Sequence, residues 1–117
     1  MCGIAGYFGN KKLDSNTIQK TLSILLRRGP DDQNYKKYQI NEFKNLYFFH
    51  TRLSIIDLDP RSNQPLEDSL FSIIFNGELY NYLEIKKDLE SKGIKFSTHS
   101  DTEVILKGYQ IYGKDLF

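Results

Sequence analysis

The single cysteine of this chain, Cys2, restricts how its 117 residues can be held together. One cysteine cannot form an internal disulfide, and it supplies no more than one thiolate to a metal site, so disulfide scaffolds and cysteine-rich zinc folds are excluded. A chain of this length buries about two thirds of its unfolded surface, which is enough for one compact core. The sequence therefore predicts one domain over residues 1–117, stabilised mainly by apolar packing.

Charge and hydropathy exclude two classes of partner. The chain carries 16 basic and 15 acidic side chains spread along its length, for a formal net charge of +1, so no basic stripe is available for phosphate backbones. No apolar run approaches the roughly 20 residues that cross a bilayer, and the first residues lack the charged flank and apolar stretch of a signal peptide. We expect no nucleic acid partner, no membrane association and a cytoplasmic location.

The hydrophobic pattern predicts a mixture of strands and helices, an α+β fold. Strands are expected at 3–8, 46–49, 53–56 and 71–75, the middle two as a pair or as one long bent strand. Helices are expected at 14–28, 81–92 and 104–112, with a loop at 57–68. Asn81 and Glu84 have the spacing of a capping box at the second helix. Ser100 and Glu103 repeat that spacing at the third.

Cys2 is the first candidate for chemistry. Removal of Met1, which a small second residue permits, would leave a thiol and a free α-amino group on the same residue. The amine titrates near pH 8 and the thiol near pH 8.5, so proton transfer between them is almost thermoneutral. Taken alone, however, a cysteine at position 2 is more often an inert apolar residue.

Asn76-Gly77, after an apolar strand, has two interpretations. A carboxamide NH2 and a nearby backbone N–H can together hold the negative oxygen of a tetrahedral intermediate. The same dipeptide, between 71–75 and 78–80, is also the strongest short hairpin signal. The residues by themselves leave both interpretations open.

Arg52, Glu78 and Asp101 match the charges of a free amino acid. A guanidinium fits an α-carboxylate, and carboxylates fit an α-ammonium. Such residues are equally common as solvated surface charges, and Asp101 suits the first turn of a helix. His50 and His99 each lack a second ligand at short spacing, so we predict packing or capping roles for them and no metal site.

Five segments in fixed order resemble one family: Cys2-Gly3-Ile4-Ala5-Gly6, Arg28-Gly29-Pro30-Asp31, Arg52-Leu53-Ser54-Ile55-Ile56-Asp57, Asn76-Gly77-Glu78-Leu79-Tyr80-Asn81 and Ser100-Asp101-Thr102-Glu103-Val104-Ile105. They resemble the N-terminal domain of glutamine-hydrolysing asparagine synthetases, which are class II glutamine amidotransferases. The resemblance runs from the first residue to about Tyr112. The second and third segments favour the synthetase type over the amidotransferases that make glucosamine phosphate or phosphoribosylamine. One departure is Arg27, where many relatives have histidine.

The resemblance implies a role for each matched residue. Cys2 would attack the side-chain amide of L-glutamine and form a cysteinyl thioester, with Asn76 and the Gly77 N–H as the oxyanion hole. Arg52 would hold the α-carboxylate, and Glu78 with Asp101 the α-ammonium. The remaining pocket wall would be the backbone of Leu53, Ser54, Ile55 and Ile56.

The resemblance also implies a fold and a larger protein. The fold is the N-terminal nucleophile (Ntn) hydrolase αββα sandwich, which we expect to be incomplete at its C-terminal end, as in a truncated chain. Relatives continue into a synthetase domain that uses ATP and Mg²⁺ to activate aspartate, so this chain is expected to need no cofactor itself. A synthetase domain or chain is the implied partner. The alternatives are a non-catalytic remnant and an amidotransferase of another class II subfamily.

Overall fold

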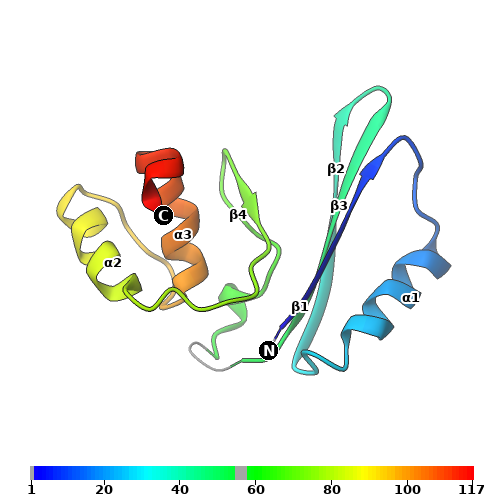
Figure 1. The fold of residues 1–117 in the computed structure, drawn as a ribbon, viewed down its shortest axis with the longest axis horizontal. Coiled ribbons are helices and arrows are strands. Elements are labelled where there is room, and N and C mark those ends of the chain that lie inside the picture. Colours follow the sequence, from blue (N-terminus) through cyan, green and yellow to red (C-terminus); the bar gives the residue numbers. More distant parts are fainter. Residues whose placement is uncertain (1, 55–57) are drawn as a thin grey trace.

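The computed structural model describes residues 2–54 and 58–117 and has helices outside two antiparallel sheets. Its elements are β1 (Gly3–Gly9), α1 (Ser15–Leu25), β2 (Asp32–Asn41), β3 (Lys44–Arg52), the 3-10 helix η1 (Pro60–Ser62), β4 (Leu66–Glu67), β5 (Ser72–Ile73), α2 (Tyr82–Ser91), α3 (Asp101–Tyr112) and the 3-10 helix η2 (Gly113–Leu116). Figure 1 shows four layers from right to left, namely α1, the three-stranded sheet, the β4–β5 hairpin, and the pair α2 and α3. The predicted α+β class is confirmed.

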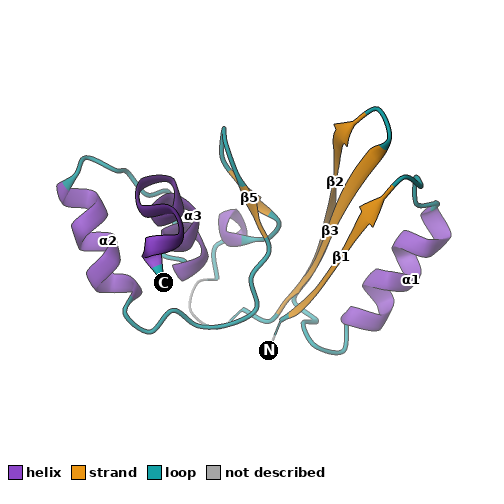
Figure 2. Ribbon diagram, turned by 45° about the horizontal axis from the view of Figure 1, so that its top comes forward, coloured by secondary structure: helices purple, strands orange, loops and turns teal. Residues whose placement is uncertain are grey.

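The larger sheet has the order β1-β3-β2, with both pairs antiparallel. Gly3 is paired with Thr51 and Asp32 with Arg52, so the start of β1 and the end of β3 meet at one end of the sheet (Figure 2). Of the two alternatives expected for 46–56, a pair of separate strands was wrong, and one long strand was right as far as Arg52, because residues 50–52 continue β3. Leu53 and Ser54 lie beyond the strand, and Ile55 and Ile56 lie outside the described residues.

Helix α1 supplies the core on one face of this sheet. The Asp14 side chain caps it by accepting from the Thr17 N–H at 2.7 Å, as preferred at an N-cap. Ile18 and Leu22 then pack against Tyr47 and Phe49 of β3, and burial of each such side chain contributes about 1.5–3 kcal/mol.

The helix ends three residues earlier than predicted, at Leu25 rather than Arg28. The hydroxyl of Thr51 donates to the Leu25 carbonyl at 2.9 Å, which ties the end of the helix to β3. Gly29 then lies against the same strand, where a Cβ would be 2.5 Å from the Thr51 carbonyl oxygen. The chain must therefore leave the helix before this close approach.

The smaller sheet consists of β4 and β5, which pair over two residues each. The predicted strand at 71–75 was too long, because only Ser72 and Ile73 take part in the ladder. Aromatic packing connects this hairpin to α3, with the rings of Phe71 and Tyr109 edge to face at 5.4 Å. Residues 74–79 leave the hairpin and lead to α2.

The capping predictions for α2 and α3 were only partly right. Asn81 is the N-cap of α2 but makes no side-chain capping hydrogen bond. Ser100 caps α3 by accepting from the Thr102 N–H at 3.1 Å. Glu103 instead accepts from the Thr98 N–H at 2.7 Å and pairs with Lys107, so neither box is reciprocal.

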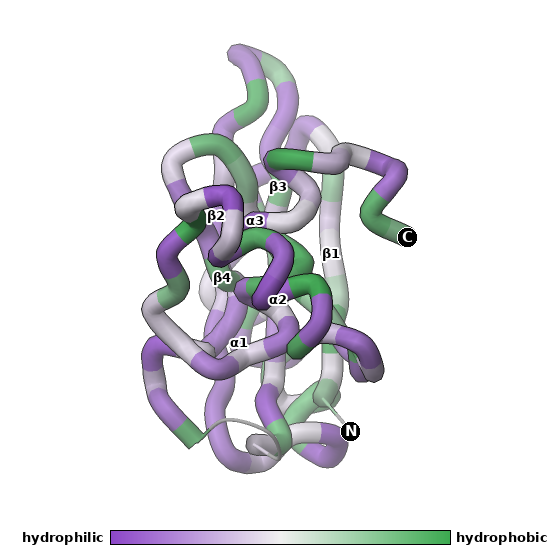
Figure 3. The backbone as a smooth tube through the Cα atoms, turned by 90° about the vertical axis from the view of Figure 1, so that its left-hand side faces the viewer, coloured by the Kyte–Doolittle hydropathy of each residue, from purple (hydrophilic) through white to green (hydrophobic). Residues whose placement is uncertain are grey.

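Helices α2 and α3 are amphipathic, and Figure 3 shows hydrophilic and hydrophobic stretches alternating along them when the molecule is seen from the α2 side. Leu89 of α2 and Val104 of α3 are almost fully buried, and Gly93, at φ 87°, reverses the chain after α2. Among the described residues no helix is long and apolar enough to cross a membrane.

Candidate functional site

A cavity of about 400 Å³ lies where the end of β3, the start of β1, residues 75–80 and the start of α3 meet. Seven residues predicted for the site line it: Cys2, Arg52, Leu53, Asn76, Gly77, Glu78 and Asp101. Of the remaining predicted residues, Ser54 is not in the wall. Ile55 and Ile56 lie outside the described residues.

Cys2 is placed by the strand that follows it. Because β1 runs antiparallel to β3, Cys2 reaches the end of β3, where the Leu53 N–H points at its Sγ at 3.4 Å. Sγ is also 3.7 Å from the Leu53 carbonyl oxygen, and Arg28 Nε donates to the Cys2 carbonyl at 3.1 Å. Contacts on both its main chain and its side chain thus hold the half-buried thiol at the cavity wall.

The segment Arg28–Asp31 fixes the strand end from the other side. The Asp31 N–H donates to the Arg52 carbonyl at 2.9 Å, and Asp31 Oδ2 accepts from the Ser54 N–H at 2.7 Å. Ser54 therefore stands behind the wall, where its backbone orients Leu53.

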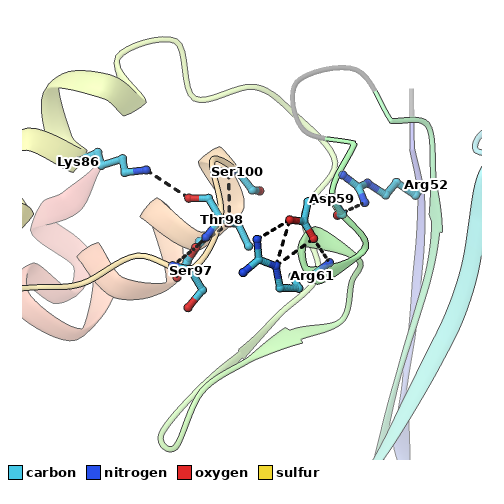
Figure 4. Close-up of polar contacts among 8 residues, drawn as sticks. Arg52, Asp59, Arg61, Lys86, Ser97, Thr98 and Ser100 are labelled. Carbon is cyan, nitrogen blue, oxygen red and sulfur yellow. Dashed lines mark hydrogen bonds and ion pairs between the residues drawn. The ribbon is translucent and has the colours of Figure 1, made fainter.

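Arg52 is buried at the end of β3, with 7% of its surface exposed. Its Nη1 donates to the Asp59 carbonyl at 3.0 Å and to Asn63 Oδ1. Asp59 is itself paired with Arg61 (Figure 4), and hydrogen bonds from Arg61 lower the pKa of Asp59 to about 2. These contacts hold the guanidinium in one orientation at the cavity.

Asn76 and Gly77 lie in the irregular segment between β5 and α2, with a bend at Gly77, and not in a hairpin turn. A type I′ turn requires positive φ at both central residues, and in the described part of the chain positive φ occurs only at Gly93 and Gly113. Residues 78–80 form no return strand. The hairpin interpretation was therefore wrong, and both Asn76 and Gly77 line the cavity.

Asp101 begins α3 and also lines the cavity. It is the first residue of α3 and is buried, with 6% of its surface exposed. Its Oδ2 accepts from the Leu79 N–H at 3.0 Å. Glu78, in contrast, is exposed at the cavity mouth. One guanidinium and two carboxylates thus face a single cavity, a charge set that suits a zwitterionic amino acid.

Six further residues in the wall were not predicted as site residues: Ser62, Gln64, Phe75, Tyr80, Ser100 and Thr102. Ser100 and Thr102 flank Asp101 in a segment that already carried a resemblance, so adjacency could have identified them. Ser62 and Gln64 belong to the stretch predicted as a loop, and no local pattern marks them as buried.

His50 lies in β3 two residues before Arg52 and is fully buried. Neither ring nitrogen has a hydrogen-bond partner among the described residues. Burial lowers the pKa of His50 from its usual value near 6.5 to about 4; the nearby Arg52 charge adds to the effect and the Phe75 backbone opposes it. The predicted packing role is confirmed, and the imidazole is neutral in the folded chain at neutral pH.

This burial predicts a loss of stability in weak acid. Between pH 7 and pH 5 the unfolded chain binds a proton on His50 that the folded chain does not bind, so the free energy of unfolding should fall by about 2 kcal/mol. Urea unfolding at several pH values measures this free energy. When it is plotted against pH, the His50→Leu variant should lack the part of the slope that comes from His50. The His99→Leu variant, changed at an exposed position, should keep it. Equal slopes in the parent and His50→Leu would show that His50 binds its proton in the folded chain over the same pH range as in the unfolded chain.

Comparison with known proteins shows which family the sequence matches. The whole chain, residues 1–117, matches a family model described as a glutamine amidotransferase domain. The chain is 40% identical over 98% of its length to glutamine-hydrolysing asparagine synthetase 1 of Bacillus subtilis, and covers 18% of that protein. It is 34% identical to asparagine synthetase 3 of the same organism, covering 19% of it. It is 37% identical to a putative asparagine synthetase 2 of Methanocaldococcus jannaschii, covering 25%. The chain therefore spans a quarter or less of the length of these relatives.

Proposed function

Because this chain belongs to the glutamine amidotransferase domain family, we propose that its cavity binds L-glutamine and that Cys2 releases ammonia from the side-chain amide. One observation carries the proposal. The thiol, the Asn76-Gly77 dipeptide and the three charged residues Arg52, Glu78 and Asp101 line the same cavity, although they come from four separate segments. Its volume of about 400 Å³ accommodates a small amino acid.

The charged residues orient the substrate. Arg52 pairs with the α-carboxylate, and its contacts to residues 59 and 63 limit the side-chain entropy lost on binding. Asp101 and Glu78 receive the α-ammonium. With both ends of the amino acid backbone held, the side-chain amide extends toward Cys2.

The first chemical step forms a thioester. After Met1 is removed, the α-amino group of Cys2 takes the thiol proton, and Sγ attacks the amide carbon. Asn76 Nδ2 and the Gly77 N–H stabilise the negative oxygen of the tetrahedral intermediate. The intermediate collapses when the α-ammonium returns the proton to the leaving nitrogen, which departs as ammonia.

The second step returns the enzyme to its starting state. Water attacks the γ-glutamyl thioester, the same α-amino group accepts a proton from this water, and the same oxyanion hole is used. Cleavage of the carbon–sulfur bond releases glutamate and the free thiol. The chain's own residues are sufficient for both steps, so we assign no cofactor to it.

The names of the longer relatives suggest what uses the ammonia. The longer relatives are named glutamine-hydrolysing asparagine synthetases. By analogy we propose that the ammonia is used for asparagine synthesis from aspartate and ATP in a synthetase part, where ATP and Mg²⁺ would bind. A thiol that must stay reduced is best maintained in the cytoplasm, which is where we place the reaction.

We also propose that the fold is the Ntn hydrolase sandwich. The order of layers, with α1 on one sheet and α2 with α3 on the other, is what an αββα arrangement requires. A nucleophile on the residue before the first strand is consistent with it. The two-residue strands β4 and β5 would then be the inner part of a wider second sheet.

Three measurements on the purified chain test the proposed function. A mass spectrum should show the loss of Met1, which frees the amine of Cys2. Thermal unfolding should show stabilisation by millimolar L-glutamine. Ammonia release from glutamine should exceed that of a Cys2→Ala variant. Retained Met1, or equal ammonia release by the two proteins, would refute the mechanism.

The small second sheet favours a second candidate, in which the cavity binds glutamine without turnover. Residues 74–79 lie outside the β4–β5 ladder, and in this candidate their geometry is too loose to stabilise a tetrahedral intermediate. Under this candidate glutamine stabilises the chain to the same extent in the parent and in Cys2→Ala, and neither protein releases ammonia.

A further inference from the structure

The segment that carries Asn76, Gly77 and Glu78 is anchored at both of its ends by side chains. The strand β5 ends at Ile73, so this segment is not part of a sheet ladder. Before it, the Phe75 N–H donates to Gln64 Oε1 at 2.5 Å. After it, the Leu79 N–H donates to an Asp101 carboxylate oxygen at 3.0 Å.

Gln64 is itself buried, with 6% of its surface exposed, and lines the cavity. The Phe75 N–H can only donate, so the carboxamide oxygen faces it and the carboxamide nitrogen faces the other way. That nitrogen, Nε2, donates to the hydroxyl of Thr102 at 3.2 Å. Both ends of one carboxamide are therefore used, and the side chain has a single orientation.

The chain of hydrogen bonds continues to Asp101. The Thr102 hydroxyl accepts from Gln64, which leaves its own proton to donate to Asp101 Oδ1, at 3.5 Å. Every donor thus points toward the carboxylate, from the Phe75 N–H through Gln64 and Thr102 to Asp101.

We propose that Gln64 is a positioning residue that couples the oxyanion-binding segment to the carboxylate that receives the substrate ammonium. It touches neither reacting atom. It sets the distance between Asn76 and Asp101, and therefore the placement of the amide carbon relative to the α-ammonium. The catalytic part of this inference rests on the proposed glutamine hydrolysis, whereas the structural coupling does not.

Two substitutions separate the two ends of this carboxamide. Gln64→Glu keeps the acceptor for the Phe75 N–H but places a carboxylate oxygen against Thr102 and near Asp101. It should raise KM for glutamine about tenfold and leave kcat within about twofold. Gln64→Met removes both hydrogen bonds at similar volume. It should lower kcat about tenfold in addition to raising KM about tenfold. Gln39→Met, on exposed β2 and outside the cavity wall, should match the parent in both parameters.

Amide hydrogen exchange tests the coupling without relying on activity. Gln64→Met should accelerate exchange about tenfold at both Phe75 and Leu79, while Phe49 in the core of β3 keeps its rate. Gln64→Glu should accelerate exchange at Leu79 alone. Unchanged exchange at Leu79 in both variants would overturn the coupling, as would variant kinetics equal to those of the parent.

The role of Gln64 can still be tested if one variant fails to fold or if the parent releases no ammonia. If Gln64→Met does not fold, Gln64→Glu and Thr102→Val decide in its place, because each breaks the bond between Gln64 and Thr102. If the parent releases no ammonia, the proposed function fails, and the exchange rates at Leu79 still decide whether Gln64 positions Asp101.

Discussion

Replacement of Cys2 with alanine is expected to reduce ammonia release from glutamine at least about a thousandfold, with little effect on glutamine binding. Sγ is the one thiol of the chain, and we propose that other residues of the cavity wall hold the substrate charges. Steady-state ammonia release gives the first quantity. Thermal stabilisation by glutamine gives the second, and it should persist in the variant.

Cys2→Ser is the matched comparison for this variant. Serine and alanine both permit Met1 removal, so the α-amino group is free in each, and Cys2→Ser retains a nucleophile of much higher pKa. We expect activity far below that of the parent but above that of Cys2→Ala. If Cys2→Ala retained a tenth of the parent rate, the nucleophile would have to be another group or a bound water, and the thioester route would be excluded.

The sequence predicted those elements whose signals are local. The spacing of Ile18 and Leu22 predicted α1 because the helix packs one face on the sheet, and Gly93 predicted the end of α2 because the turn there needs positive φ. Boundaries set by distant contacts were missed. The end of α1 depends on Thr51, and the shortness of β5 depends on pairing with only two residues of β4.

Seven predicted site residues line one cavity, but the reason for their meeting is not local. Cys2 and Arg52 are brought together by the pairing of β1 with β3, and an ordinary strand pattern does not specify its partner. Gln64 illustrates the limit more clearly. It stands in a polar stretch before a proline, and only the packed structure reveals that its carboxamide is buried between two segments of the wall.

Replacement of Asn76 with alanine is expected to lower kcat about 10²- to 10³-fold while KM changes by no more than a few fold. In the proposed mechanism the carboxamide donates to an oxygen whose negative charge develops on the way to the transition state, so its removal costs little in the ground state. Loss of one such donor corresponds to about 3–4 kcal/mol of transition-state stabilisation. Initial rates over a range of glutamine concentrations separate the two parameters.

The control for this variant is Asn10→Ala, an exposed asparagine in the turn after β1 and outside the cavity wall. It should match the parent in both parameters. A different pattern at Asn76, with KM raised a hundredfold and kcat unchanged, would mean that the carboxamide binds the substrate in its ground state. The Gly77 N–H would then be the main oxyanion donor. That outcome would keep Cys2 as the nucleophile and transfer the electrostatic role to the backbone, which no side-chain substitution removes.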